Sequence, residues 1–236
     1  MGVIIFNNKS SADCRIQVAH PPGYAYPERD YTITHIPGRN GDIIQDNGCY
    51  KNVERTYEVS FDAPNEDFAT YANAVSAWLH STTGYARLED SYEPDYYRMA
   101  VYQESNIFEN LYNKAGTATI VFECKPQRFL KTGETPVTIT SPVDFLSNPT
   151  GFEAYPLIKV SGTFGTLTIN DNQTITLSSI DSYTMLDCEL QDAYKETTNK
   201  NSTISGTFPV LKPGSNTIGW TGNISSVIIT PRWWTI

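Results

Sequence analysis

Residues 53–61, Val-Glu-Arg-Thr-Tyr-Glu-Val-Ser-Phe, alternate along the chain and stand shortly before a helical pattern. Successive side chains of a β-strand point to opposite faces, so the odd-numbered residues share one face. These residues are Val53, Arg55, Tyr57, Val59 and Phe61. The stretch therefore predicts a strand that presents one consistent face, followed by an element of a different period.

The segment that follows predicts the one helix of the chain. Its apolar stripe recurs at helical spacing and consists of Phe68, Tyr71, Ala72, Val75, Trp78 and Leu79. Asn65 can cap the first turn, where Glu66 and Asp67 suit the helix dipole. A helix of about 15 residues with such a stripe needs a sheet to cover. We interpret the stripe as core and not as a ligand site.

The rest of the chain predicts strands separated by turns. In the first half, strands are expected in residues 1–6, 14–18, 31–36 and 116–124, with turns at 37–41 and 46–48. From residue 157 onward the expected strands are 157–160, 165–169, 173–177, 183–187, 189–194, 206–211, 214–220 and 226–231. Their regular spacing favours an antiparallel sandwich or barrel. Breaks between residues 131 and 156 place the boundary near 130, which gives domains 1–130 and 131–236.

Composition agrees with a mainly-β protein and limits the classes of function. The 236 residues are 39% apolar and 12% aromatic, with 15 Tyr. Lys and Arg total 17 against 26 Asp and Glu, a formal net charge of −9. This excess of acid argues against specific nucleic-acid binding, which depends on cations that neutralise phosphates. No run of about 18 apolar residues is present, so we expect no membrane span.

Motifs for metal, cofactor or catalytic chemistry are absent from the sequence. Cys14, Cys49, Cys124 and Cys188 are far apart, which predicts reduced and mostly buried thiols and no zinc site. No phosphate-binding loop, dinucleotide fingerprint, nucleophile elbow or zinc-protease motif occurs. We therefore expect no cofactor and no enzyme activity.

One acidic cluster is open to three interpretations. Glu89, Asp90, Glu93 and Asp95 stand beside three tyrosines. Two of these carboxylates could serve a glycosidase, which needs a pair about 5–10 Å apart. A solvated acidic turn is the simpler interpretation, and a contact surface for a partner is the third.

Two further segments are candidate contact surfaces. Arg39, Asn40 and Asp42 lie in a turn-rich tip that is equally a plain hairpin turn. Arg232, Trp233 and Trp234 could form a sugar platform or a partner anchor, although half-buried edge-strand aromatics are the simpler reading. A carbohydrate-binding module for host cell-wall glycans is the alternative function that these tryptophans suggest.

Several stretches in this order resemble the distal tail protein family of siphophages that infect Gram-positive bacteria. The resemblance covers nearly the whole chain and rests on Val3–Asn7, Gly38–Asp42, Tyr57–Phe61, Glu89–Arg98, Val121–Phe129, Tyr155–Val160, Thr168–Asn170, Thr174–Leu177, Phe208–Ile218 and Ile229–Trp233.

The resemblance implies a structural protein of the virion tail tip, assembled in the host cytoplasm. It implies an N-terminal β-sandwich with one α-helix and an extended hairpin, and a C-terminal galectin-like β-sandwich. Family members form a hexameric ring that joins the tail tube to the hub or tail-associated lysin and lets DNA pass. A receptor-binding protein can also dock on the ring, but no segment here is long enough for a large grasping arm in the second half.

Two hypotheses follow for this chain. Residues 28–60 would form the hairpin that pairs neighbouring subunits, because unpaired strand edges invite a partner strand. Residues 1–130 carry 11 basic and 17 acidic side chains, so an acidic wall would repel passing DNA. The candidate interface residues are Arg39, Asn40, Asp42, Tyr50, Arg55, Glu93, Asp95, Arg232, Trp233 and Trp234.

Overall fold

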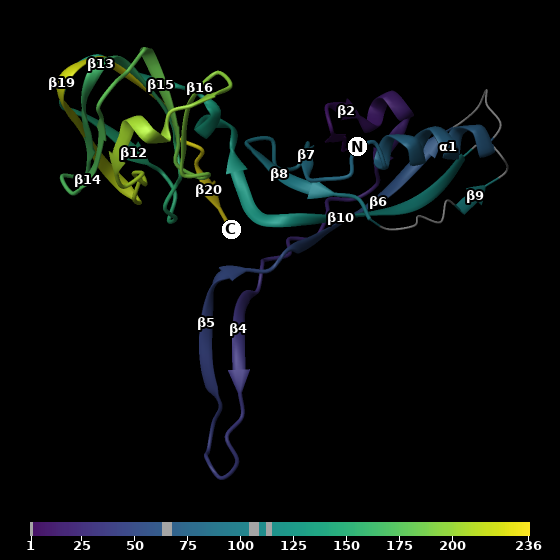
Figure 1. Ribbon diagram of the computed structural model, residues 1–236. Coiled ribbons are helices and arrows are strands. Elements are labelled where there is room, and N and C mark those ends of the chain that lie inside the picture. Colours follow the sequence, from purple (N-terminus) through teal and green to yellow (C-terminus); the bar gives the residue numbers. More distant parts are fainter. Residues whose placement is uncertain (1, 63–67, 104–108, 112–114) are drawn as a thin grey trace. The chain divides into compact units, whose positions relative to one another are not determined.

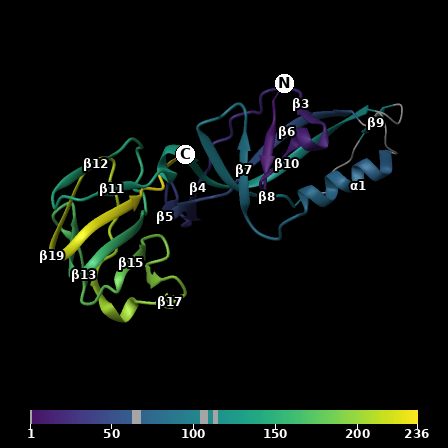
Figure 2. The same ribbon diagram turned by 90° about the horizontal axis from the view of Figure 1, so that it is seen from above.

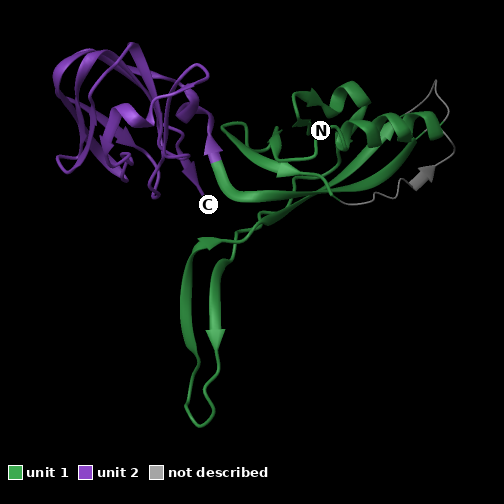
Figure 3. Ribbon diagram, in the orientation of Figure 1, with its two compact units in different colours: residues 1–128, 236 green, residues 129–235 purple. Residues whose placement is uncertain are grey.

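The chain forms two compact units in a computed structural model that describes residues 2–62, 68–103, 109–111 and 115–236. Unit 1 comprises residues 1–128 with residue 236, and unit 2 comprises residues 129–235 (Figure 3). Each unit has its own apolar core. Apart from three short 3-10 turns, at Ser11–Cys14, Lys131–Glu134 and Asn201–Thr203, and one α-helix, the regular structure described is all β-strand. The mainly-β fold with a single helix is confirmed for the described residues.

Unit 1 is built on one curved sheet. Its strands are β1 (Ile4–Phe6), β2 (Lys9–Ser10), β3 (Ile16–Val18), β6 (Val53–Asp62), β7 (Ala86–Asp90), β8 (Tyr96–Val101), β9 (Glu109–Leu111) and β10 (Ala115–Leu130). The order is β2-β1-β7-β8-β10-β6-β3, and β9 pairs with β10. An isolated bridge between Gly2 and Val18 brings the start of the chain to β3, so the sheet curls back on itself.

β6 supplies the inner face that its alternation predicts. All five odd-numbered side chains from Val53 to Phe61 are buried, while the even-numbered ones face outward. β6 pairs antiparallel with β10 over ten residue pairs, from Val53 opposite Cys124 to Asp62 opposite Ala115. The long pairing fixes the register, because a slip by one residue would turn every apolar side chain to solvent.

Helix α1 (Phe68–Leu79) covers this inner face (Figures 1 and 2). Tyr71 stacks on Phe61 at a ring separation of 5.0 Å and donates its hydroxyl to the carbonyl of Cys14. The indole of Trp78 donates to the carbonyl of Phe6 at 3.1 Å. Burying each such aromatic contributes about 1.5–3 kcal/mol. The predicted cap by Asn65, with Glu66 and Asp67, lies outside the described residues.

The predicted hairpin exists, but it is shorter than residues 28–60. β4 (Arg29–Thr34) and β5 (Ile43–Tyr50) form a separate two-stranded sheet that extends away from the sheet of unit 1 (Figure 1). We call residues 29–50 the arm. Residues 53–60 belong to β6, since their apolar face needs the core, whereas the arm has no buried face.

The prediction of a turn at residues 46–48 is wrong. β5 continues through these residues, and the pairing shifts between Arg29 and Tyr31. Residues 47–49 of β5 stand opposite the single residue Asp30 of β4 and form a bulge. Within it Gly48 takes a positive φ of 76°, a conformation that glycine adopts at little cost. The turn predicted at 37–41 is the tip of the arm.

Unit 2 surrounds its core with strands. They are β11 (Val137–Ile139), β12 (Asp144–Asn148), β13 (Leu157–Ile169), β14 (Gln173–Leu177), β15 (Ser182–Asp187), β16 (Asp192–Lys195), β17 (Thr198–Asn199), β18 (Ile204–Gly206), β19 (Gly214–Thr230) and β20 (Trp234–Thr235). The order is β11-β19-β13-β15-β16-β17, with β12 on β19 and β14 between β13 and β18.

Two pairs of predicted strands are in fact single long strands. β13 joins 157–160 to 165–169, and β19 joins 214–220 to 226–231. The alternation breaks where the register shifts near Gly162, and not where a strand ends. Two shorter expectations also change, because β16 spans only 192–195 and β18 ends at Gly206.

Two glycines of β19 test how closely β13 and β19 approach each other. Gly214 and Gly222 have φ angles of 82° and 86°, but only a Cβ at Gly222 would meet another backbone, 2.7 Å from Cα of Gly165. Gly214→Ala should cost about 1–2 kcal/mol of unfolding free energy from the left-handed backbone alone. Gly222→Ala should cost about 1–3 kcal/mol more because it overpacks the strand pair. Urea unfolding of the two variants measures the difference, and equal losses would contradict the close approach.

Candidate assembly surface: the arm and its root

The arm exposes nearly all of its side chains. Both strands are solvent-exposed along their length except for half-buried Asp30 and Tyr50. Among the described residues, β4 and β5 pair only with each other. A lone two-stranded ribbon is marginally stable in water, because it buries little apolar surface and leaves two open backbone edges.

One face of the arm is apolar at its centre. Ile33 stands opposite Ile44, and Tyr31 lies two residues before Ile33 on the same face. Their exposed fractions are 47% for Tyr31, 63% for Ile33 and 64% for Ile44. We call these three residues the apolar face of the arm. Thr32 and Gln45 form the neighbouring cross-strand pair on the opposite, more polar face.

Polar contacts close both ends of the apolar face. The root of the arm is its end at residues 29 and 50, with the flanking segments 19–28 and 51–52 that join it to the rest of unit 1. Toward the root, Arg29 forms an ion pair with Asp46 at 2.6 Å and donates to the hydroxyl of Tyr50. The hydrogen bond from Arg29 lowers the pKa of Asp46. Toward the tip, the imidazole of His35 lies 2.9 Å from a carboxylate oxygen of Asp42. An apolar centre with a polar rim is the usual anatomy of a protein interface.

The predicted tip residues lie together on the arm. Arg39, Asn40 and Asp42 are all exposed at or beside its closing turn. Tyr50 lies at the opposite end, where its ring sits 5.1 Å from the guanidinium of Arg29.

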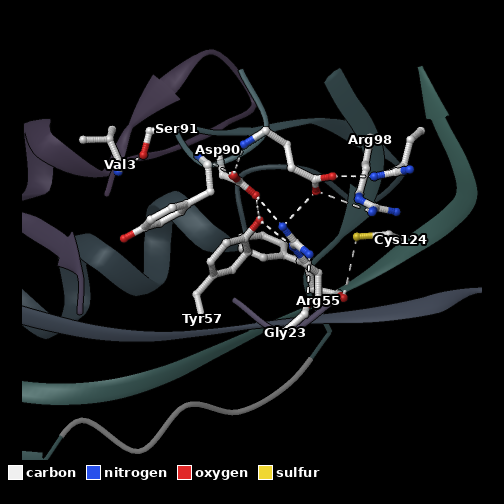
Figure 4. Close-up of polar contacts among 12 residues, drawn as sticks. Val3, Gly23, Arg55, Tyr57, Asp90, Ser91, Arg98 and Cys124 are labelled. Carbon is white, nitrogen blue, oxygen red and sulfur yellow. Dashed lines mark hydrogen bonds and ion pairs between the residues drawn. The ribbon is translucent and has the colours of Figure 1, made fainter. Parts of the chain in front are cut away.

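The interface prediction would require Arg55 to lie at the surface. Arg55 is instead buried, next to the segment that leads into the arm. Its side chain is 2% exposed. One nitrogen donates to the carbonyl of Gly23 at 2.9 Å, and another lies 3.0 Å from Asp90 and 2.9 Å from Glu93 (Figure 4). The guanidinium also lies 5.4 Å from the ring of Tyr24. Arg55 therefore joins the segment that leads into the arm to the buried interior of unit 1.

Glu93 is likewise internal and bridges several arginines. Besides Arg55, its carboxylate contacts Arg128 at 2.6 Å and Arg98 at 3.6 Å. Breaking a buried ion pair from one side is costly, since the remaining charge loses its partner in a poorly solvated site. The contacts of Glu93 are therefore structural, while Asp95 in the same turn is exposed.

Asp90 shapes the turn that presents Glu93. One carboxylate oxygen accepts the backbone N–H groups of Tyr92 and Glu93, and the other accepts the hydroxyl of Tyr57 at 2.8 Å. Burial, reinforced by the charge of Asp90, raises the pKa of Tyr57 well above its usual value. Tyr57 thus stays a neutral hydrogen-bond donor.

The cluster does not favour the glycosidase reading. Both oxygens of Glu93 contact arginines, and Glu89 pairs with Arg87. Burial raises the pKa of the neighbouring Cys124 thiol to about 12, which disfavours a nucleophilic thiolate. In the described part of the chain, no group of three or more His, Cys, Asp or Glu residues could hold a metal ion. No helix of that part is long and apolar enough to cross a membrane.

A second contact fastens the other side of the root. The side-chain amide of Asn52 donates to the hydroxyl of Tyr85 at 2.6 Å and to Glu123 at 2.7 Å. Asn52 lies between β5 and β6, so the arm is held where the chain enters it and where the chain leaves it.

The outward face of β6 and β10 is acidic. Glu54 and Glu58 are exposed on β6, and Glu123 stands directly opposite Glu54. Like charges opposite each other in an antiparallel pair are destabilising. The hydrogen bond from Asn52 to Glu123 offsets part of this repulsion.

The C-terminal candidates belong to unit 2 and are largely engaged there. Arg232 makes two hydrogen bonds to Asp187, at 2.8 and 3.0 Å. Trp233 is 5% exposed within the core. Trp234 stacks on Phe152 at 4.5 Å and donates its indole N–H to a backbone carbonyl. The two tryptophans therefore do not form a free sugar platform, and the carbohydrate-binding alternative loses the feature that suggested it.

The sequence did not predict most of the side-chain contacts that hold the root of the arm. Asp90, Arg98, Arg128 and Asn52 were not identified as parts of one structure, since their contacts join distant strands. One signal was present, because Arg55 occupies an inward position on an otherwise apolar face. A buried guanidinium requires carboxylate or carbonyl partners.

The ion pair between Asp187 and Arg232 should make the free energy of unfolding depend on pH. Although burial opposes it, the hydrogen bonds from Arg232 and nearby backbone lower the pKa of Asp187. A carboxylate with a lowered pKa stabilises the fold above its ordinary pKa and loses this effect as the pH falls through the folded-state value. Asp187→Asn should cost about 1 kcal/mol at pH 7, and its difference from the wild type should shrink below pH ~4.

Chemical unfolding between pH 7 and pH 2 measures this effect. Asp171→Asn, which changes an exposed turn carboxylate of the same unit, is the control and should differ little from the wild type. A constant difference between Asp187→Asn and the wild type across this range would contradict the ion pair.

Comparison with known proteins shows what this fold resembles. No protein-family model and no curated protein matches the chain. A solved structure, the SPP1 Dit (gp 19.1) protein, matches with a TM-score of 0.79 at 13% identity. The match covers 100% of both chains. That protein is described as a paradigm of the hub adsorption apparatus in phages that infect Gram-positive bacteria. The mainly-β fold expected from the resemblance to distal tail proteins is thus confirmed, and the likeness extends over the full length of the chain.

Proposed function

We propose that this chain is a structural protein of a phage tail tip, with the role of a distal tail protein. The full-length match to the fold of SPP1 Dit carries the proposal. The unpaired arm adds an independent argument, since its apolar face and open edges suit a chain that is completed by assembly. In this function the protein acts by binding its neighbours and not by catalysis.

We further propose that six copies form a ring in the virion. The apolar face of each arm would bind the adjacent copy, with Arg39, Asn40 and Asp42 at the far end of the contact. The ring would join the tail tube to the hub or tail-associated lysin. Unit 2, the galectin-like domain of this proposal, would be available for further tail components such as a receptor-binding protein. Assembly would take place in the host cytoplasm.

Substitutions on the two faces of the arm test the ring. Ile33→Asp with Ile44→Asp should abolish the oligomer, because the charges would be buried in an apolar contact. Thr32→Asp with Gln45→Asp is the matched control, since it places two carboxylates opposite each other on the other face. Native mass spectrometry should find a hexamer for the wild type and the control, and a monomer for the first variant.

Thermal unfolding separates loss of assembly from loss of fold. Each double variant should keep the melting temperature of unit 1, because the arm lies outside its core. A hexamer that survives the substitution of Ile33 and Ile44 would refute this interface. A wild-type protein that stays monomeric at all concentrations would refute self-assembly through the arm.

We propose that the acidic face of β6 and β10 lines the passage for DNA. Glu54, Glu58 and Glu123 would repel phosphate, and the destabilising Glu54–Glu123 pairing would be retained for that purpose. The excess of acidic side chains in the first half of the sequence agrees with this placement.

Charge reversal tests the acidic face. Rings with Glu54→Lys and Glu58→Lys should bind duplex DNA, and the binding should weaken steeply as salt is raised. Rings with Asp171→Lys and Glu196→Lys change the same charge on exposed turns of unit 2 and should not retain DNA. Filter binding at several salt concentrations measures both. Equal DNA binding by the two variants would contradict a lumen lined by β6 and β10.

A further inference from the structure

The arm is connected to unit 1 by two short segments. Residues 19–28 lead into β4, and residues 51–52 lead from β5 into β6. The first segment has no regular secondary structure and contains Pro21, Pro22 and Pro27, which have no backbone N–H to donate. Its direction therefore depends on contacts from the rest of the unit.

Arg55, which is buried on β6, makes such contacts with the first segment. It donates to the carbonyl of Gly23 and lies beside the ring of Tyr24, in the middle of the first segment. Tyr24 is 58% exposed, so the ring covers the guanidinium from the solvent side without belonging to the core. Arg55 thus fastens this segment by a charge-assisted hydrogen bond and a cation–π contact.

The position of Arg55 is fixed in turn by two carboxylates. Asp90 and Glu93 hold one of its terminal nitrogens, and the Tyr57 hydroxyl lies beside its Nε. Arg128 engages the second oxygen of Glu93. Because the guanidinium is planar and has several fixed donors, it can bind the carboxylates and the Gly23 carbonyl at the same time, which a lysine ammonium does less well.

We propose that Arg55, oriented by Glu93, is a positioning residue that sets the direction of the arm before assembly. A preset arm loses less conformational freedom when it docks, so assembly occurs at lower protein concentration. This second consequence rests on the proposed ring, whereas the positioning of the arm can be measured in a single chain.

A cysteine at the tip of the arm, introduced by the substitution Asn40→Cys, provides a label that moves with the arm, because Asn40 is exposed in the closing turn. The exposed Cys49 lies at the end of β5 nearest unit 1 and is replaced by Ser, while Cys14, Cys124 and Cys188 are buried and will react slowly in the folded protein. A second cysteine introduced by Asn73→Cys, on the exposed side of α1, gives a reference point in the same unit. Single-molecule energy transfer between dyes at these positions, at subnanomolar concentration, reports the arm of isolated chains.

The wild type should give one narrow distribution of transfer efficiencies. Arg55→Lys and Glu93→Gln should broaden or split it, and Tyr24→Ala should broaden it less. Asp95→Asn is the control, because it changes an exposed carboxylate of the same turn, and it should match the wild type. Narrow distributions in both Arg55→Lys and Glu93→Gln, at the wild-type position, would overturn the proposal.

Two further measurements separate the possible failures. Circular dichroism melting identifies a variant that has lost its fold, and Tyr24→Ala then still tests the root, since it leaves the buried cluster intact. Light scattering over a concentration series should show that Arg55→Lys needs about tenfold more protein to form rings. If the arm of Arg55→Lys is mobile but rings form at the same protein concentration as in the wild type, then the fixed direction of the arm does not assist assembly. Absence of rings in the wild type would refute the proposed function but leave the positioning result standing.

Discussion

A two-stranded ribbon cannot bury its own apolar side chains, and this constraint governs the structure of unit 1. The arm exposes Tyr31, Ile33 and Ile44 on one face and leaves both backbone edges unpaired by described strands. Within one chain these features have no benefit, because exposed apolar edges invite unwanted pairing. They become favourable when another surface covers them. In the proposed ring, the rest of unit 1 would hold the ribbon where the neighbouring copy meets it.

The buried ion cluster is the part of unit 1 best suited to that task. A core built from Val, Ile and Phe alone would be cheaper to desolvate than Arg55, Asp90 and Glu93. Apolar side chains, however, cannot bind the carbonyl of Gly23 in a defined direction. The guanidinium of Arg55 does so from a base fixed by β6, the β7–β8 turn and β10. On this view the cluster exchanges some stability for orientation.

The sequence allowed the local elements to be predicted better than the contacts between them. Alternation from Val53 to Phe61 and the stripe from Phe68 to Leu79 predict β6 and α1, because each follows one period. The bulge at Gly48 and the bend at Gly162 both look like turns in sequence, since turns and register shifts both place glycine at a positive φ. Glu93 and Arg128 meet only through tertiary pairing, so no local pattern could predict their contact with Arg55.

Hydrogen exchange of the arm amides tests the central claim most directly. Protein diluted to the monomer should exchange the outward-facing amides of residues 29–50 rapidly, while the amides of β6 and β10 stay protected. At concentrations where rings form, the arm amides should slow markedly as a neighbour covers them, with little change in unit 2. Equal exchange of the arm in monomer and ring would contradict an arm completed by assembly.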